Sequence, residues 1–402
     1  MRYIIILFFA FIISNQILSQ ENKEVFMNNM YKDVNYLASD KLKGRKTGTK
    51  GEKKAAKYIK RKFKEYGLEA KGSCDYYQKF QGKINYHQTS EIQKGFNVIG
   101  FCDNNQDNTI IIGAHYDHIG LGEAGSLHVG ENEIHNGADD NASGVSILLN
   151  LANKLCDNQL YNYLFIAFSG EEEGLLGSSY FAKNPTIDLS KVKFMLNFDM
   201  VGRLNEKKEL AINGTGTCQK WEDLLKKSND FNLKLITSES GVGPSDHTSF
   251  YWQNIPSIHF FTGQHSDYHK PSDDIEKINF EGMYLILSFV TKIIEQSYYI
   301  SDFDFQETTN NNTQTPKFNV TLGIMPDYLY DGIGLRIDGV TKEKTAFKFG
   351  VKKGDVILEV GDIEIKDIMD YMKALGLFKK GDKTNLKVKR GEMIIELAIT
   401  FL

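Results

Sequence analysis

The chain has 402 residues, of which 25% are charged and 41% hydrophobic, and its formal net charge is −4. This length exceeds the usual size of one domain, and the apolar content is sufficient to fill a complete core. Acidic and basic residues nearly balance and form no basic patch, which argues against nucleic-acid binding. We therefore expect a protein of two domains that binds no nucleic acid.

The amino terminus is typical of a secretory signal peptide. Met1 and Arg2 precede an apolar run at residues 3–13, polar residues follow, and Ser19 provides a cleavage site. The run is too short to span a membrane, and no later segment reaches the roughly 18 apolar residues that a span requires. We expect residues 1–19 to be removed and the mature protein to be exported, to the periplasm or beyond, without a membrane span.

The next part of the chain alternates between helical and strand patterns. Residues 23–66 have apolar side chains at helical spacing, interrupted by a loop at 43–48, and predict two helices. Strands are predicted at 97–101, 109–115, 161–168, 193–198 and 255–261, and helices at 145–155, 221–228 and 280–300. We therefore expect an α/β domain over residues 20–300, with a mixed, mostly parallel sheet flanked by helices.

The composition changes after Ile300. Residues 301–317 are polar, with little to bury, and predict a linker. Residues 318–402 contain short strand patterns, turn dipeptides such as Gly354-Asp355 and Gly381-Asp382, and one helical segment at 367–375. They predict a separate, small β-rich domain.

Four cysteines are scattered along the chain: Cys74, Cys102, Cys156 and Cys218. They form no CxxC pair, so they are not typical of a zinc knuckle. Export permits a disulfide, but the sequence leaves the pairing open.

Candidate metal ligands occur in five short segments, AHYDH, GADDNASG, GEEEGLLGS, NFDMVG and DYHKPSDD. Imidazole and carboxylate groups suit zinc, and one shared carboxylate can hold a second ion about 3.5 to 4 Å from the first. His115, Glu171 and Asp199 each lie at or just after the end of an apolar strand, where sites gather in open α/β sheets. The segments together predict a two-metal hydrolase site.

Each candidate also has a simpler explanation. A lone histidine such as His115 is usually a hydrogen-bonded core residue, and residues 171–173 alone resemble a solvated charge run. Asp199, between Phe198 and Met200, would be a buried carboxylate that costs several kcal/mol unless it is paired or metal-bound. The combination favours a site. His247 fits a substrate contact or a loop cap equally well, and His118, His128 and His135 are predicted to be loop residues.

In this order, the motifs resemble those of secreted co-catalytic dizinc aminopeptidases, in the zinc exopeptidase superfamily that includes glutaminyl cyclases and transferrin-receptor-like proteins. The resemblance covers residues 25–300 and implies two zinc ions, with Asp140 as the bridging ligand and Asp139 as a neighbour. The implied ligands are His115, Asp140 and Asp199 for one ion, and Asp140, Glu172 and His269 for the other.

The resemblance also implies roles in catalysis. Glu171 matches the general base, which takes a proton from the metal-bridging water and passes it to the departing amine. Asp117 matches the carboxylate that accepts a hydrogen bond from the His115 ring nitrogen that does not bind metal. Tyr268 matches a residue whose hydroxyl can reach the oxyanion of the tetrahedral intermediate. The implied substrates are peptides with free N-termini. A carboxypeptidase, a dipeptidase, a glutaminyl cyclase and a non-enzymatic binding protein are the alternatives.

The C-terminal segment resembles a PDZ domain over residues 318–402. The resemblance rests on Leu322-Gly323-Ile324, on residues 350–357 and on residues 379–382. It implies that backbone N–H groups of Leu322, Gly323 and Ile324 receive the terminal carboxylate of a peptide, which adds a strand to the sheet edge. The alternative is a module that only packs against the larger domain or shields its entrance.

Overall fold

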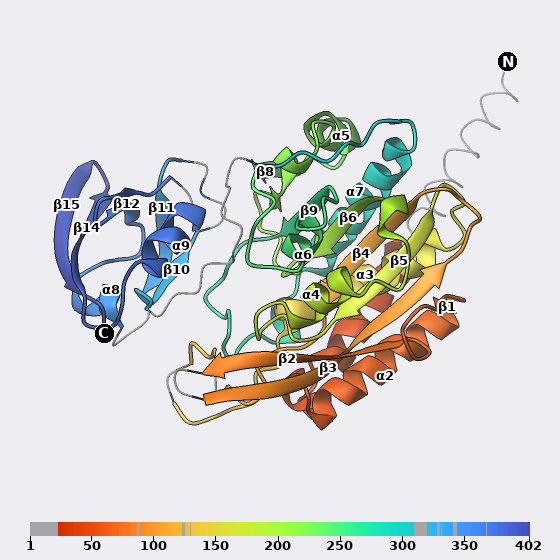
Figure 1. Cartoon of the computed structure of the whole chain (residues 1–402), viewed down its shortest axis with the longest axis horizontal. Coiled ribbons are helices and arrows are strands. Elements are labelled where there is room, and N and C mark those ends of the chain that lie inside the picture. The colour runs from red at the N-terminus through yellow and green to blue at the C-terminus, as the bar shows by residue number, and fades with distance from the viewer. Residues whose placement is uncertain are drawn as a thin grey trace, which may run out of the picture.

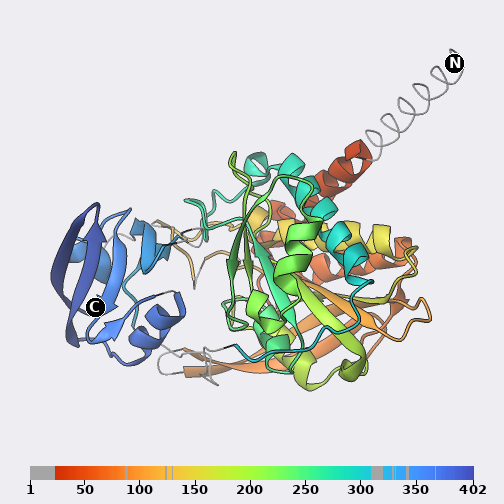
Figure 2. The same cartoon turned by 90° about the horizontal axis from the view of Figure 1, so that it is seen from above.

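A computed structural model describes residues 23–86, 89–122, 125–128, 130–308, 320–327, 330, 332–340, 344–366 and 368–402. The predicted signal peptide lies outside these residues. The described chain forms a larger α/β domain and a smaller, β-rich C-terminal domain, which stand side by side in both views (Figures 1 and 2). The two-domain organisation expected from the sequence is therefore visible.

The larger domain is built on a mixed sheet. As far as the structure describes the chain, nine strands take part, in the order β1-β3-β5-β4-β6-β9-β7-β8, with β2 paired to β3. The centre is parallel, because β4 runs parallel to β5 and β6, and β6 runs parallel to β9. Antiparallel strands β3 and β7 flank this centre. The strands are β1 (Glu69–Ala70), β2 (Tyr77–Tyr86), β3 (Thr89–Cys102), β4 (Thr109–His115), β5 (Asn162–Phe168), β6 (Val192–Phe198), β7 (Glu209–Asn213), β8 (Lys234–Ser238) and β9 (Ser257–Phe261).

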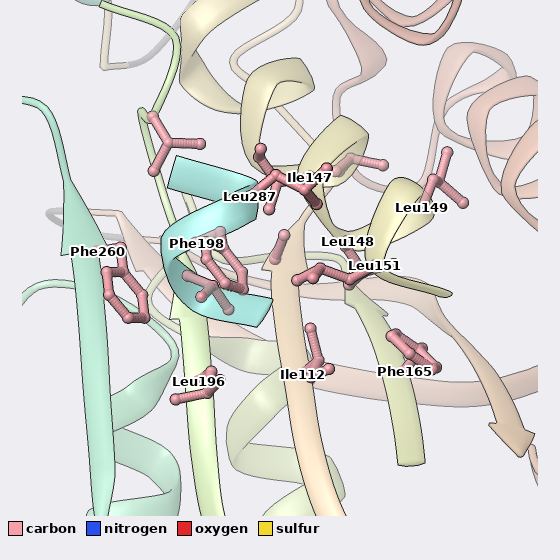
Figure 3. Close-up of a cluster of buried hydrophobic side chains, with 14 of the residues drawn as sticks. Ile112, Ile147, Leu148, Leu149, Leu151, Phe165, Leu196, Phe198, Phe260 and Leu287 are labelled. Atoms are coloured by element: carbon pink, nitrogen blue, oxygen red, sulfur yellow. The ribbon is translucent and has the colours of Figure 1, made fainter. Parts of the chain in front are cut away.

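The central strands are buried on both faces. In β5, the odd-numbered residues 163–167 belong to one apolar cluster and the even-numbered residues 164–168 to another, because side chains alternate along a strand. The first cluster includes side chains of the helix at 23–37, α2, α3, α5 and α7; Figure 3 shows part of it. The second includes side chains of α4 and α6. The helices are α2 (Lys50–Glu65), α3 (Gly144–Leu155), α4 (Leu176–Lys183), α5 (Trp221–Ser228), α6 (His247–Tyr251) and α7 (Phe280–Ser297).

Every strand and helix predicted for this domain is present within a few residues of its expected bounds, except that β3, predicted at 97–101, begins at Thr89. The prediction missed β1, β2, β7, β8, α4 and α6, which are short or carry many polar residues. In β8, for example, Lys234 and Ser238 are exposed, so no continuous apolar run marks it. The helix α6 is buried throughout, but its five residues are too few to show a helical period.

One disulfide, between Cys102 and Cys156, joins the end of β3 to the C-terminal end of α3. Cys74 and Cys218 are free thiols. The pairing that the sequence left open is therefore resolved.

The C-terminal domain has its own apolar core. Its described sheet has the order β10-β11-β12-β14-β15, with β13 paired to β12. The predicted helix is present as α9. The elements are β10 (Ile324–Pro326), β11 (Leu335–Val340), α8 (Thr345–Lys348), β12 (Val356–Val360), β13 (Ile363–Glu364), α9 (Ile368–Gly376), β14 (Lys383–Arg390) and β15 (Met393–Thr400).

The start of the predicted linker packs on the larger domain. Phe303 is buried, with its ring 4.7 Å from that of Trp221, and the Thr308 backbone N–H donates to the Tyr251 hydroxyl. Met372 of α9 packs with Phe305 beside Val242. Residues 303–308 are thus held in place, unlike a free linker. Among the described helices, none combines the length and hydrophobicity needed to cross a bilayer.

Replacing Phe165 by Ala tests the packing of the sheet against its helices. Phe165 is fully buried, so the truncation should lower the free energy of unfolding by about 3 to 5 kcal/mol. Urea unfolding followed by tryptophan fluorescence measures this, because Trp221 and Trp252 both lie in the larger domain. Tyr299→Ala, at a side chain that is 82% exposed, should change stability by no more than about 0.5 kcal/mol. Equal effects of the two substitutions would contradict the described core.

Candidate metal centre

The candidate ligands converge because parallel strands end at one edge of the sheet. His115 is the last residue of β4, Asp199 directly follows β6, and the 171–172 pair follows β5. Asp140 lies in the segment at 138–143 that leads into α3, and His269 lies in the loop after β9. All five predicted ligands are therefore brought to the carboxyl edge of the parallel strands.

The first donor group is formed by His115, Asp140 and Asp199. The Nε2 atom of His115 lies 3.3 Å from Asp140 Oδ1 and 3.3 Å from Asp199 Oδ1. The Ser245 hydroxyl donates to the other Asp199 oxygen at 2.8 Å and orients that carboxylate. All three side chains are buried or nearly so.

The second donor group is formed by His269, Asp140 and Glu172. The Nε2 atom of His269 lies 3.2 Å from Asp140 Oδ2 and 3.1 Å from Glu172 Oε2. Its Nδ1 atom lies 2.8 Å from the Gly125 carbonyl, to which it donates, so the Nε2 lone pair points to the carboxylates. The two oxygens of Asp140 thus face two different imidazoles.

These distances fit metal coordination. Ligand atoms about 2.0 to 2.1 Å from a tetrahedral zinc lie about 3.3 Å from one another, which is the spacing in both groups. A neutral imidazole has only one N–H, so Nε2 cannot donate good hydrogen bonds to two carboxylates at once. His115, Asp140 and Asp199 form one group in which a metal ion could be held.

His118 is a histidine that the sequence interpretation assigned to a loop without a role. It does lie in a loop, but its ring is buried, with Nδ1 2.7 Å from Glu172 Oε1 and 3.8 Å from Asp140 Oδ2. With these two carboxylates it forms another group that could hold an ion. His118 lies only three residues after His115, at the same strand end, and this proximity could have indicated from the sequence that His118 belongs to the site.

Asp117 differs in detail from its predicted role. Its carboxylate lies 3.7 Å from His115 Nδ1, beyond hydrogen-bonding distance, and the nearest acceptor is the Asp117 carbonyl at 3.3 Å. The carboxylate instead accepts hydrogen bonds from the Thr47 hydroxyl at 3.0 Å and the Glu171 backbone N–H at 3.3 Å. Asp117 therefore positions the strand end that carries Glu171.

The adjacent acids Glu171 and Glu172 have opposite electrostatic surroundings. Burial raises the pKa of Glu171 well above its ordinary value, although His115 opposes the shift. Burial would also raise the pKa of Glu172, but His269 lowers it to about 2. Neighbouring carboxyl groups whose pKa values diverge are typical of a division into proton-transfer and ligand roles.

The imidazoles respond to the same negative charge. Burial alone would lower the pKa of His115 and His269, but Glu171 and Glu172, respectively, contribute most to raising each well above the ordinary value. The metal-free site therefore attracts positive charge strongly.

A cavity opens beside the two donor groups. Tyr268 lies on its wall, and its ring stacks on His269 with 3.9 Å between centroids. The lining residues are Asp140, Glu171, Glu172, Asp199, Met200, Asn213, Pro244, His259, Phe261, Gln264 and Tyr268.

Three other histidines named in the sequence analysis, His128, His135 and His247, do not line the cavity. His128 pairs with Glu133 at 3.1 Å, and His135 Nε2 lies 2.8 Å from the Ser126 hydroxyl. His247 is fully buried at the start of α6 and does not line the cavity, which disfavours the substrate contact.

Arg45 is a buried residue that sequence reasoning missed. Its guanidinium is fully buried and donates to the carbonyl groups of Leu37, Tyr116, Asn136 and Gly137 at 2.5 to 3.1 Å. Tyr116 directly follows His115, and Gly137 lies three residues before Asp140, so Arg45 ties together the two segments that carry these ligands. No sequence pattern reveals that a lysine-rich loop folds inward.

Each of the two domains matches the model of a known family. Residues 97–293 match peptidase family M28, and residues 307–401 match the PDZ domain. Aminopeptidase YwaD of Bacillus subtilis (strain 168) is 32% identical over 175 residues, 40% of this chain and 38% of that protein. The chain spans between 38% and 54% of the length of the first curated relatives that it matches.

Solved structures show the shared fold. BSAP, a zinc aminopeptidase from Bacillus subtilis, matches with a TM-score of 0.55 at 19% identity, over 70% of this chain and 98% of that chain. Porphyromonas gingivalis glutaminyl cyclase matches with a TM-score of 0.56 at 16% identity, over 67% of this chain and 98% of that chain. The predicted zinc exopeptidase fold and PDZ resemblance are confirmed.

The role of Arg45 can be tested with Arg45→Leu. The substitution leaves four carbonyl groups without their donor, and each unsatisfied buried group costs about 1 to 3 kcal/mol. We expect urea unfolding to show a loss of at least about 3 kcal/mol. Arg61→Leu, which removes a surface arginine, should cost no more than about 0.5 kcal/mol. A loss below about 1 kcal/mol for Arg45→Leu would show that the ligand segments do not depend on it.

Proposed function

We propose that this chain, which carries a peptidase family M28 domain followed by a PDZ domain, is a zinc-dependent aminopeptidase that removes N-terminal residues from peptides. The observation that carries the proposal is the position of Asp140, whose two oxygens each lie within 3.3 Å of a different imidazole. The aminopeptidase relatives named above support exopeptidase action. Two adjacent metal positions are suited to amide hydrolysis.

In this proposal the two donor groups hold two zinc ions. One ion is bound by His115, Asp140 and Asp199, and the other by Asp140, Glu172 and His269. Bound zinc supplies Lewis-acid polarisation of the substrate carbonyl and lowers the pKa of water. His118 supports the second group from outside, because its Nδ1 lies 2.7 Å from the free side of the Glu172 carboxylate.

Glu171 acts as the general base. It lines the cavity, its Oε2 lies 4.0 Å from His115 Nε2, and it belongs to neither donor group. It takes a proton from the attacking water and delivers it to the departing amine. Asp117 positions Glu171 through its backbone N–H, and the Tyr268 hydroxyl faces the developing oxyanion.

The protein is proposed to act after export. The signal-like segment at 1–19 and the disulfide between Cys102 and Cys156 support this, because disulfides persist in oxidising compartments. The PDZ domain is proposed to bind a C-terminal peptide at Leu322, Gly323 and Ile324. Gly323 has a φ of +71°, and glycine adopts this conformation without strain.

Mass spectrometry of the zinc-loaded protein with matched free and N-acetylated peptides tests the proposal. We expect stepwise loss of residues from free N-termini and no change in the acetylated peptides. Loss from C-termini would indicate a carboxypeptidase, internal cuts an endopeptidase, and loss of ammonia from N-terminal Gln a cyclase. Any of these outcomes without N-terminal shortening would refute the aminopeptidase.

Glu171→Gln tests the separation of base and ligand roles. The variant should retain the zinc content of the unmodified protein but lose about 10²- to 10⁴-fold in kcat, because a general base contributes on that order. Metal analysis and peptide kinetics measure the two effects. Glu173→Gln is the matched control: burial raises the pKa of Glu173 to about 8, so Gln resembles its neutral form. Similar kcat values for the two variants would remove Glu171 from the mechanism.

A further inference from the structure

The wall of the cavity beside the metal centre is built by two antiparallel strands. In β7 and β9, Asn213 pairs with His259, and Ala211 pairs with Phe261. Paired residues place their side chains on the same face of a sheet, and residues two apart share that face. The side chains of all four residues therefore share one face, and Asn213, His259 and Phe261 line the cavity.

The cavity has an apolar part and a polar part. Met200, Phe261 and the partly buried Tyr268 pack together in one small cluster. Asn213, His259 and Gln264 contribute polar side chains to the same lining. A pocket for an aliphatic side chain would not need these three groups.

Two of the polar groups are buried with hydrogen-bonding capacity left over. The His259 side chain is 4% exposed, and the one group that its ring reaches is the Asp199 backbone, so at least one ring nitrogen has no hydrogen-bond partner in the described part of the chain. The Oε1 atom of Gln264 is likewise buried and unpartnered among the described residues. The nearby His247 ring, 4.9 Å away, has no such partner either. Unsatisfied buried polar groups cost about 1 to 3 kcal/mol each, so these atoms point to a ligand that hydrogen-bonds them.

The charge of the cavity limits which ligand fits. Of the carboxylates on one side, Asp140, Glu172 and Asp199 would be balanced by zinc, but Glu171 belongs to neither donor group, so an acidic side chain would meet its like charge. These carboxylates belong to the metal centre and the base, so they are not available to pair with a basic side chain. A neutral side chain with both a donor and an acceptor satisfies the imidazole, the Asn213 amide and the Gln264 oxygen.

We infer, resting on the proposed aminopeptidase function, that His259 together with Asn213 and Gln264 selects substrates whose N-terminal residue is Asn or Gln. The carboxamide of that residue lies against the polar part of the cavity, and its methylene groups lie against Met200 and Phe261. His259 is the principal specificity residue, because it is buried in the cavity wall and keeps at least one ring nitrogen without a protein partner.

Near-isosteric substrate pairs test the inference. Peptides that differ only in an N-terminal Asn or Leu, and Gln or Met, are compared by kcat/KM with the zinc-loaded full chain. We expect at least about ten-fold higher values for the amide member of each pair, because a site built to hydrogen-bond rejects analogues that lack the group. Equal values, or a preference for Leu and Met, would overturn the inference while leaving the aminopeptidase intact.

His259→Phe separates the role of the imidazole from that of the rest of the cavity. It should lower the Asn-to-Leu ratio by at least about ten-fold, chiefly through loss on the Asn peptide. His128→Phe, the same change at a histidine outside the cavity, should leave the ratio unchanged. Zinc content and the urea midpoint confirm folding, and His259→Gln, which keeps a donor and an acceptor, should restore part of the ratio. An unchanged ratio in a folded His259→Phe protein would refute the role of His259.

If the protein shortens no peptide, the specificity of the cavity can still be tested by measuring ligand binding. Calorimetry with free L-asparagine and L-leucine should show tighter binding of asparagine to the zinc-loaded protein. Tighter or equal binding of leucine would overturn the specificity. Absent hydrolysis together with preferred asparagine binding would refute the proposed function alone.

Discussion

The constraint on which the rest of the structure depends is buried negative charge. The side chains of Asp140, Glu171, Glu172 and Asp199 are between 5% and 13% exposed and gather within one site. Burying carboxylates costs several kcal/mol each unless they are paired or metal-bound. The imidazoles of the site offset only part of this charge. The two divalent ions that we propose, shared through Asp140, would balance the remainder, which would account for one carboxylate facing two histidines.

The fold holds these buried carboxylates close together by fixing the backbone segments that carry them. Parallel strands bring His115 and Asp199 to one edge, and the buried Arg45 holds the carbonyl groups that flank two ligand segments. Asp273 accepts hydrogen bonds from the backbone N–H groups of residues 139 and 140 at 3.0 and 3.1 Å. The candidate ligands are therefore positioned by hydrogen bonds between protein groups that involve the main chain.

The sequence placed the candidate ligands His115 and Asp199 at the ends of apolar strands, because a strand end can be read from hydrophobicity alone. It missed Arg45, and although it correctly placed His118 in a loop, it did not predict that this ring is buried beside Glu172. The sequence also did not predict that His259 pairs with Asn213 across neighbouring strands. The strand β7 was not predicted, and strand pairing joins residues that are far apart in the chain. The disulfide could not be paired for the same reason. Local patterns predicted the scaffold, whereas the cavity depends on tertiary contacts.

Anomalous diffraction at the zinc absorption edge, from crystals of the zinc-loaded full chain, tests the central claim most directly. The account predicts two peaks about 3.5 to 4 Å apart on either side of the Asp140 carboxylate. One peak should lie beside His115 and Asp199, and the other beside Glu172 and His269. A single peak, or two peaks of which one is not bound by Asp140, would contradict the shared-carboxylate centre.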